Sequence, residues 1–316
     1  MYIAFIIIGV LVLLFFAFLL YVYDTAFYNS MKKRFKKPLE MRGEQYEKFA
    51  VELKESVDNM LKEEYIPVEI TSYDGLKLKA RYYHFKDGAP TDIIFHGYRS
   101  FAMNDCGGGF KIAQEMGYNV LLPDNRGHGQ SEGKNVTFGI KDRLDCLAWT
   151  YYLARKYPDS PQFISGISMG AATVLMASDL DFPKQVKGIV ADCPYSAPED
   201  IILKAAKDMG YPAKVARPFV YAAARMFAGF RLNETSAMDA VKNAQVPVLI
   251  IHGEDDRFVP CEMSRKIFDA CNGKKKLLIV KNAGHGLSYF ADGDAYRKAV
   301  KDFKNAAISG DDDYFA

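Results

Sequence analysis

The sequence has almost no net charge. It contains 41 Lys and Arg residues against 39 Asp and Glu residues, a formal net charge of +2 at pH 7. This balance provides no general electrostatic field for holding nucleic acid, so we expect no nucleic-acid partner. The phosphate-binding pattern G-x-x-x-x-G-K-[ST] is also absent, and the glycine run at 107–109 therefore predicts no nucleotide site. We expect that run only to loosen the start of a helix.

Cysteine is scarce and scattered. No cysteines form a cluster with metal-ligand spacing, and Cys261 and Cys271 stand too far apart for C-x-x-C chemistry. An odd, dispersed set favours free thiols in a reducing compartment over a disulfide framework. We therefore expect no metal and no organic cofactor. The five cysteines are Cys106, Cys146, Cys193, Cys261 and Cys271.

Charge is missing altogether from Tyr2 to Tyr23, and residues 3–22 are almost entirely Ile, Leu, Val, Phe and Ala. At about 1.5 Å per residue these twenty positions extend about 30 Å, the hydrocarbon thickness of a bilayer. The run lacks the basic start of a signal peptide and has no small-x-small cleavage site before Asp24. It therefore predicts an uncleaved N-terminal transmembrane anchor, residues 1–30.

Positive charge stands on only one side of this run. The side before it has no Lys or Arg, so the positive-inside rule places the rest of the chain in the cytoplasm of a single-pass membrane protein. The same cluster is suited to contact with anionic lipid headgroups. The basic residues that follow the run are Lys32, Lys33, Arg34, Lys36 and Lys37.

The segment 31–66 continues from this basic cluster into an amphipathic linker helix over residues 42–61. Its apolar residues recur at helical spacing with Glu and Lys between them, and we expect that stripe to pack on the domain that follows. The stripe consists of Tyr46, Phe49, Leu53, Val57 and Met60.

Residues 67–310 have the pattern of one α/β domain. Alternating runs at 68–73 and 76–83 around Asp74-Gly75 predict a hairpin. Short apolar runs then alternate with helical stretches, which predicts a mostly parallel sheet with helices on both faces. The expected strands are 92–95, 119–123, 162–165, 188–192, 248–252 and 277–280. The expected helices are 110–116, 140–157, 169–178, 262–270 and 295–307.

Residues 196–244 interrupt that alternation, because they contain no strand-like run. Their apolar residues lie on short helical pieces broken by Pro212, Pro218 and Gly229. Nearly fifty residues between two strands is far more than a crossover needs. We interpret the segment as a helical cap inserted over the active edge of the sheet, with some of its apolar side chains lining an acyl pocket.

A serine between two glycines stands where a strand meets a helix. In Gly166-Ile167-Ser168-Met169-Gly170, such a turn is a nucleophile elbow that pushes the hydroxyl of Ser168 out over the sheet. The N–H of Met169 would be one oxyanion donor, and that of Tyr98, after the strand 92–95, the other. Both follow the carboxyl ends of predicted strands, where the chemistry of parallel sheets is found.

The base and the acid of such a site also follow strands. His285 lies in a glycine-flanked loop after the last strand, whereas His84, His96, His128 and His252 stand in the hairpin or in tight turns. The preceding strand ends before Asp255 and Asp256, and a third carboxylate, Asp192, ends another strand. An acid is needed to fix the tautomer of the histidine. The residues alone do not choose among the three.

From about residue 67 to 307 the sequence resembles the α/β-hydrolase superfamily, and it is most similar to bacterial esterase and monoacylglycerol-lipase-like members. In that family the acid is the Asp three residues before Val-Pro, which selects Asp256. The resemblance implies an α/β-hydrolase fold and a Ser168, Asp256, His285 triad that cleaves carboxylic esters, acyl or lipid-like, through an acyl-enzyme. The motifs that carry it are His96-Gly97-Tyr98, Asp124-x-Arg126-Gly127-His128-Gly129-x-Ser131, Gly166-x-Ser168-x-Gly170, His252-Gly253-x-x-Asp256-x-x-Val259-Pro260 and Gly284-His285.

Two other functions are compatible with these residues. A catalytically silent, membrane-tethered binding or scaffold module is one, since fold does not dictate function. A peptidase or thioesterase with the same triad is the other. The partner expected for the leading function is a small-molecule ester, and nothing in the sequence indicates an oligomeric state.

Overall fold

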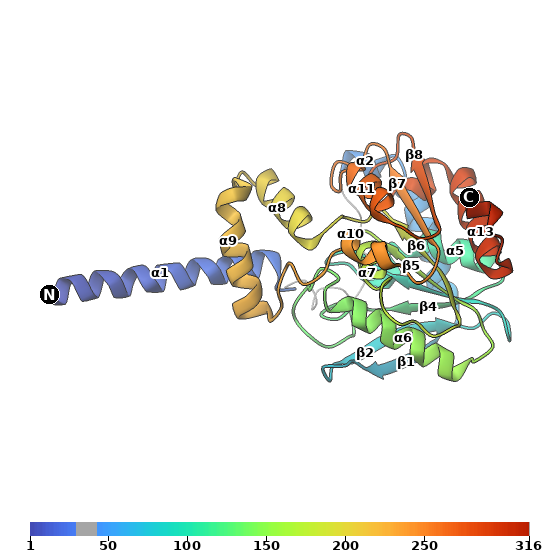
Figure 1. Ribbon diagram of the computed structural model, residues 1–316, viewed down its shortest axis with the longest axis horizontal. Helices are drawn as coiled ribbons and strands as arrows, with labels where there is room; N and C mark the ends of the chain where they lie inside the picture. Colours follow the sequence, from blue (N-terminus) through green and yellow to red (C-terminus); the bar gives the residue numbers. More distant parts are fainter. Residues whose placement is uncertain (30–42, 316) are drawn as a thin grey trace.

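The computed structural model describes residues 1–29 and 43–315. The basic cluster at 32–37 lies outside the described residues. A layered α/β body carries one long helix, α1, that projects away from it beside two helices of the 196–244 segment (Figure 1).

One eight-stranded sheet runs through the body in the order β1-β2-β4-β3-β5-β6-β7-β8. The hairpin β1–β2 is antiparallel, β2 pairs antiparallel with β4, and every later pairing is parallel. Strands β3 and β4 are buried at every position, as expected for parallel strands covered on both faces. The strands are β1 (Ile66–Thr71), β2 (Lys77–Tyr83), β3 (Thr91–Phe95), β4 (Asn119–Pro123), β5 (Gln162–Ile167), β6 (Val186–Asp192), β7 (Val248–Gly253) and β8 (Lys275–Val280).

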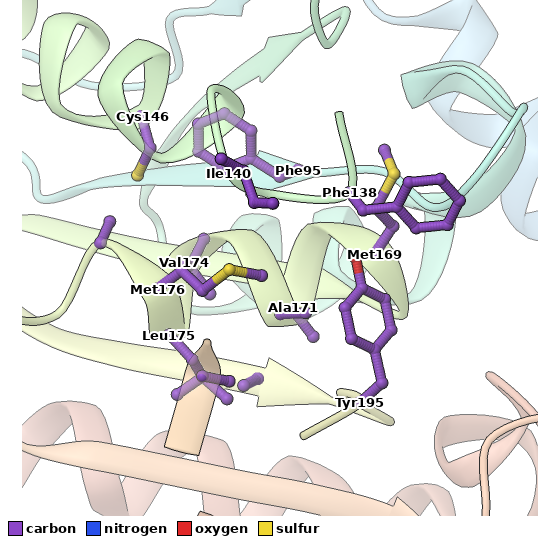
Figure 2. Packing of buried hydrophobic residues seen from close by; sticks show 14 of the residues in the cluster. Phe95, Phe138, Ile140, Cys146, Met169, Ala171, Val174, Leu175, Met176 and Tyr195 are labelled. Atoms are coloured by element: carbon purple, nitrogen blue, oxygen red, sulfur yellow. The ribbon is translucent and has the colours of Figure 1, made fainter. Parts of the chain in front are cut away.

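Helices cover both faces of the sheet, and each face has its own apolar core. One core receives side chains of α6, α7 and α11, and the other receives side chains of α3, α5 and α13. Figure 2 shows part of the first of them, in which Val174 and Leu175 of α7 belong to one cluster with Phe95 and Ile140. The body helices are α4 (Ala102–Asp105), α5 (Gly107–Glu115), α6 (Asp142–Lys156), α7 (Met169–Met176), α11 (Glu262–Ala270), α12 (Ser288–Ala291) and α13 (Gly293–Ser309), followed by the 3₁₀ turn η4 (Asp313–Phe315).

The glycine run at 107–109 serves close packing in this body. A Cβ on Gly107 would lie 2.6 Å from Oγ of Ser56, and one on Gly108 would lie 3.0 Å from the ring of Tyr289. A Cβ at either position would therefore require the side chain of Ser56 or Tyr289 to move. These glycines therefore also serve close packing, a role that the sequence did not indicate.

The linker is two helices rather than the single one expected over 42–61. Helix α2 (Glu44–Glu47) and helix α3 (Ala50–Lys62) are separated at Phe49, whose backbone is not helical (φ −116°, ψ 14°). The break turns the Phe49 ring towards Phe290, 6.4 Å between centroids. Tertiary packing of this ring thus overrides the helical pattern. Val57 and Met60 are buried on the body.

The segment 196–244 divides into two parts. Helix α8 (Pro198–Asp208), helix α9 (Ala213–Ala223) and the π-helical turn η2 (Ala224–Ala228) lie beside α1, away from the sheet (Figure 1). Helix α10 (Ala237–Ala240) and the 3₁₀ turn η3 (Val241–Asn243) return to the body, where α10 packs against α7. The helical insertion that leaves the body is therefore the first part, which ends where Gly229 adopts the left-handed conformation (φ 76°).

Helix α1 (Tyr2–Ala26) is long and apolar enough to cross a membrane, and its first sixteen residues are exposed. Its end is part of the body. Leu19 and Phe27 are fully buried, and the carbonyl of Phe27 accepts a hydrogen bond of 2.7 Å from the N–H of Val136. The Phe27 ring meets Phe138 and Phe230 edge to face. Phe27, with Val22, Tyr23 and Ala26 packed beside it, thus belongs to the apolar core of the body.

We expect Phe27→Ala to destabilise the protein by about 3–5 kcal/mol, because it empties a fully buried site. At roughly 2–4 °C per kcal/mol, the apparent melting temperature in detergent should fall by about 10 °C. Phe16→Ala, in the same helix but 41% exposed, is the control and should change it little. Equal effects of the two substitutions would contradict the buried role of Phe27.

Candidate active site

Ser168 stands on a turn that only glycine neighbours allow. Its backbone has φ 54° and ψ −115°, a strained conformation for a residue with a side chain. A Cβ on Gly166 would lie 2.4 Å from the carbonyl carbon of Gly170, and one on Gly170 would lie 2.1 Å from the carbonyl oxygen of Phe95. The end of β5 and the start of α7 are thus in direct backbone contact with each other and with β3, as in a nucleophile elbow.

His285 reaches Ser168 from the loop after β8. Its Nε2 lies 2.9 Å from Oγ of Ser168, and its Nδ1 lies 2.7 Å from Oδ2 of Asp256. The ring packs 5.0 Å from that of Phe258. The hydroxyl of Tyr46 donates a hydrogen bond of 3.1 Å to the carbonyl of His285, so α2 of the linker supports this loop. The three side chains form a continuous Ser-His-Asp chain of hydrogen bonds.

Asp256 is the carboxylate that faces His285. Its Oδ1 accepts hydrogen bonds from the N–H groups of Phe258 and Val259, both 2.8 Å. Burial alone would raise the pKa of Asp256, but hydrogen bonds from His252 and His285 and the charges of both rings outweigh it and hold the pKa well below its usual range. Asp256 is therefore an anion throughout the neutral pH range.

The other two candidate acids are placed differently. Asp255 is exposed, and its N–H donates to the carbonyl of Ala283. Asp192 is buried below the serine, where its carbonyl accepts a hydrogen bond of 2.8 Å from the N–H of Ser168. The structure thus pairs Asp256 alone of the three with the imidazole.

His252 is a support that sequence reasoning assigned only to a tight turn. Its Nε2 lies 2.9 Å from the carbonyl of Val259 and 3.2 Å from Oδ2 of Asp256, so that nitrogen carries the proton. Its Nδ1 accepts from the hydroxyl of Ser264 at 2.6 Å. The sequence feature that could have indicated this support of Asp256 is the His252-Gly253 pair at the end of β7, because His252 stands four residues before the acid.

The loop after β3 lies directly beside Ser168. A Cβ on Gly97 would lie 3.5 Å from Cβ of Ser168, and the N–H of Gly97 donates to Oδ2 of Asp105 at 2.8 Å. Within residues 1–29 and 43–315, the N–H groups of Tyr98 and Met169 donate to no protein acceptor. Two backbone donors are thus available at the two sides of the serine, which is the arrangement an oxyanion hole needs.

His96 and His128 hold this loop rather than face the serine. Nε2 of His96 accepts from the N–H of Asn125 at 3.0 Å, and Nε2 of His128 accepts from the N–H of Arg99 at 3.2 Å. Both rings are fully buried and meet edge to face, 5.1 Å between centroids. These contacts give the two rings a structural role in the tight turns that contain them.

Cys193 completes the one group of three potential metal ligands found among the described residues, with Asp256 and His285. Burial raises the pKa of the Cys193 thiol well above its usual value, so the sulfur stays protonated. Metal binding needs the thiolate. Both nitrogens of His285 are also engaged, one with Ser168 and one with Asp256. The donor set therefore suits a proton relay better than a metal.

An apolar cavity of about 470 Å³ opens above Ser168. This volume lies within the range of small-molecule sites. Its walls come from α8 and α9 of the insertion, from Tyr98 and Phe138 of the body, and from residues 18–26 of α1. Sequence reasoning expected the cap to line such a pocket but gave no role to α1.

Two family models match the chain. The model described as serine aminopeptidase, S33, matches residues 93–228, which include Ser168. The model described as serine hydrolase (FSH1) matches residues 205–287, which include Asp256 and His285. With the sheet topology, these matches identify the chain as a serine hydrolase of the α/β-hydrolase superfamily.

Within that class the chain is similar to several known proteins. It is 28% identical over 251 residues to the uncharacterized protein YqkD of Bacillus subtilis, covering 79% of this chain and 81% of that one. It is 29% identical over 179 residues to the lysophosphatidylserine lipase ABHD12 of Danio rerio, covering 53% of this chain and 43% of that one. The esterase Pf2001 of Pyrococcus furiosus shares the fold, with a TM-score of 0.63, 24% identity, and coverage of 84% of this chain and 96% of that one.

The buried Asp192 gives a testable pH dependence of stability. Burial raises the pKa of its carboxyl to about 6, although the charges of His252 and His285 and a hydrogen bond with Tyr296 act in the opposite direction. An unfolded Asp titrates near pH 3.9. The folded state therefore holds this proton more tightly, and the stability that the group supplies falls as pH rises from about 4 to about 6.

Asn at this position cannot ionise. We therefore expect the melting temperature of Asp192→Asn, relative to that of the wild type, to rise across pH 4–6 and to level off above that window. Thermal unfolding of both proteins from pH 3.5 to 8 measures the difference. A difference that is constant with pH would contradict the assignment of this titration to Asp192.

Proposed function

We propose that this protein is a membrane-anchored hydrolase of carboxylic esters, acyl or lipid-like, that works through Ser168, His285 and Asp256. The observation that carries the proposal is the hydrogen-bond chain from Ser168 Oγ through His285 to Asp256, at 2.9 and 2.7 Å, on a strained elbow below an apolar pocket. The domain would comprise residues 67–310, as the resemblance implies.

In the proposed reaction Ser168 attacks the ester carbonyl while Nε2 of His285 takes its proton and then gives it to the departing alcohol. A water activated by the same nitrogen hydrolyses the acyl-enzyme and releases the acid. The anionic Asp256 holds the imidazole in the needed tautomer. The N–H groups of Tyr98 and Met169 would stabilise the oxyanion, each by about 3 kcal/mol of barrier.

The pocket favours an acyl chain over a peptide. Among the described residues that line it, Arg99 is the only charged one, and no carboxylate is present to hold a free α-ammonium group. An aminopeptidase needs a carboxylate of this kind to bind the N-terminus of its substrate. The pocket therefore does not favour the aminopeptidase activity by which one of the matching families is described. The names of a similar lipase and of an esterase with the same fold agree with ester chemistry.

Substitution of the triad tests the proposal. Ser168→Ala and His285→Ala should each lower kcat by on the order of 10⁶, and Asp256→Asn by about 10⁴. Asp255→Asn, at the exposed neighbouring carboxylate, is the matched control and should retain most activity. Hydrolysis of p-nitrophenyl acetate and labelling of Ser168 by a fluorophosphonate probe supply the measurements. A folded wild-type protein that neither turns over nor labels would favour the silent scaffold module.

The same proposal includes the anchor. Helix α1 has no charged residue before Asp24, and the basic cluster that follows it stands on one side only, which together support a single span with the catalytic domain in the cytoplasm. The exposure of α1 supports the same span, because its first sixteen residues expose large apolar side chains. An exposed apolar surface of this size is unfavourable in water.

We expect the full chain to remain in the membrane pellet after a carbonate wash. The catalytic domain should be protected from external protease in intact spheroplasts and be digested once they are lysed, because positive flanking charge keeps it inside. Immunoblotting against the C-terminus reads both outcomes. Digestion in intact spheroplasts would reverse the orientation, and release by carbonate would remove the anchor.

A further inference from the structure

The pocket above Ser168 has one wall that belongs to the N-terminal helix. Phe18, Tyr21, Val22 and Thr25 of α1 recur at helical spacing and face the cavity. The opposite wall comes from α8 and α9, and Ser168 lies at the floor. The anchor expected from the sequence is therefore also a boundary of the proposed substrate site.

Aromatic contacts join the two walls. Phe219 of α9 meets Phe18 edge to face, 5.0 Å between centroids, and lies 6.3 Å from Phe15. Phe18 and Phe219 both line the cavity. Helix α9 thus crosses α1 at the level of Phe15 and Phe18, well before α1 ends at Ala26.

The length of α1 determines where that crossing lies. Residues 2–17 extend only about 24 Å at 1.5 Å per residue, whereas the hydrocarbon core of a bilayer is about 30 Å thick and needs about twenty residues. A helix that spans the bilayer must therefore use Phe18 and Tyr21 as part of its span. The wall that α1 contributes to the pocket then lies at the edge of the hydrocarbon region. The part of α9 that contacts α1 lies there too.

The insertion has the composition that such a position requires. Met209, Val215 and Met226 are each more than half exposed, and the first two also line the cavity. Lys214 and Arg225 are exposed close to them in the chain. Exposed apolar side chains beside basic ones are typical of protein surfaces that lie in the headgroup region of a membrane.

We propose that the substrate is a single-chain lipid ester that enters the pocket sideways from the bilayer, with its acyl chain packed along Phe18 and Tyr21 of α1. This proposal rests on the proposed function. The alcohol leaves in the first step with the proton taken from Ser168. Water is the second reactant: its oxygen joins the acyl carbon, and one of its protons returns through His285 to Oγ of Ser168. The fatty acid returns to the membrane, and the alcohol carries the headgroup into water. Residues of α1 therefore help to set chain-length preference.

A matched pair of phenylalanines in α1 tests the wall. Phe18 lines the pocket and is 42% exposed, whereas Phe16 is 41% exposed and does not line it. With the full chain reconstituted in phosphatidylcholine vesicles, Phe18→Ala should lower kcat/KM for p-nitrophenyl dodecanoate about tenfold, at roughly fourfold per methylene that loses contact. It should leave the acetate ester within twofold, and Phe16→Ala should change neither ester.

A second variant acts in the opposite direction. Val22→Phe adds volume to the same wall, so the chain length with the highest kcat/KM should become shorter. This outcome does not depend on Phe18→Ala folding normally. Fluorophosphonate labelling of each variant reports whether its Ser168 site is intact.

Surface dilution tests the source of the substrate. Adding empty vesicles at constant total dodecanoate ester lowers its mole fraction in the bilayer, and the rate should fall in proportion while the rate on the water-soluble acetate ester stays constant. A dodecanoate rate that follows total concentration would overturn entry from the bilayer. Unchanged chain-length profiles in labelled, acetate-active Phe18→Ala and Val22→Phe would overturn the α1 wall. A wild-type protein that is neither labelled by the fluorophosphonate probe nor active on the acetate ester would instead refute the proposed function.

Discussion

Backbone-to-backbone packing around Ser168 is the constraint on which the rest of the site depends. Gly170 lies against the carbonyl of Phe95 at the end of β3, and Gly166 lies against the first turn of α7, with no room for a Cβ at either position. This contact forces the turn that exposes the serine hydroxyl. Because β3 and β5 are parallel neighbours, the same contact brings the loop after β3, with the N–H of Tyr98, beside the serine. Nucleophile and proposed oxyanion donor are therefore positioned together.

Two segments that precede the region of family resemblance, the end of α1 and helix α2, contact the loops on either side of Ser168. The side chain of Arg99, next to Tyr98, donates to the carbonyls of Asp24, Thr25 and Tyr28 at the end of α1. Tyr46 of α2 donates to the carbonyl of His285. The loops on either side of the serine thus depend on residues that precede the hydrolase domain in the chain. Both contacts link parts of the molecule that a domain boundary near residue 66 would separate.

Local patterns were sufficient for the sheet and for the elbow. A continuous apolar run such as 119–123 predicts a buried strand from a few neighbouring residues, and β4 has the same bounds. The glycines around Ser168 likewise predict the elbow from a few neighbouring residues. Features that depend on distant partners were not predictable. The break at Phe49 depends on Phe290, and the tight start of α5 depends on Ser56 and Tyr289. The position of α1 against the pocket depends on Phe219, two hundred residues away.

The three hydrogen bonds from Arg99 also restrict how α1 can respond to its surroundings. A free transmembrane helix adjusts to bilayers of different thickness mainly by tilting. Here a guanidinium holds the carbonyl end of the helix, where its positive charge also interacts favourably with the helix dipole, and Phe27 just beyond that end is packed in the core of the body. If α1 spans a bilayer as proposed, its tilt is set by the folded domain. Hydrophobic mismatch must then be met by local thinning or thickening of the lipid around the helix.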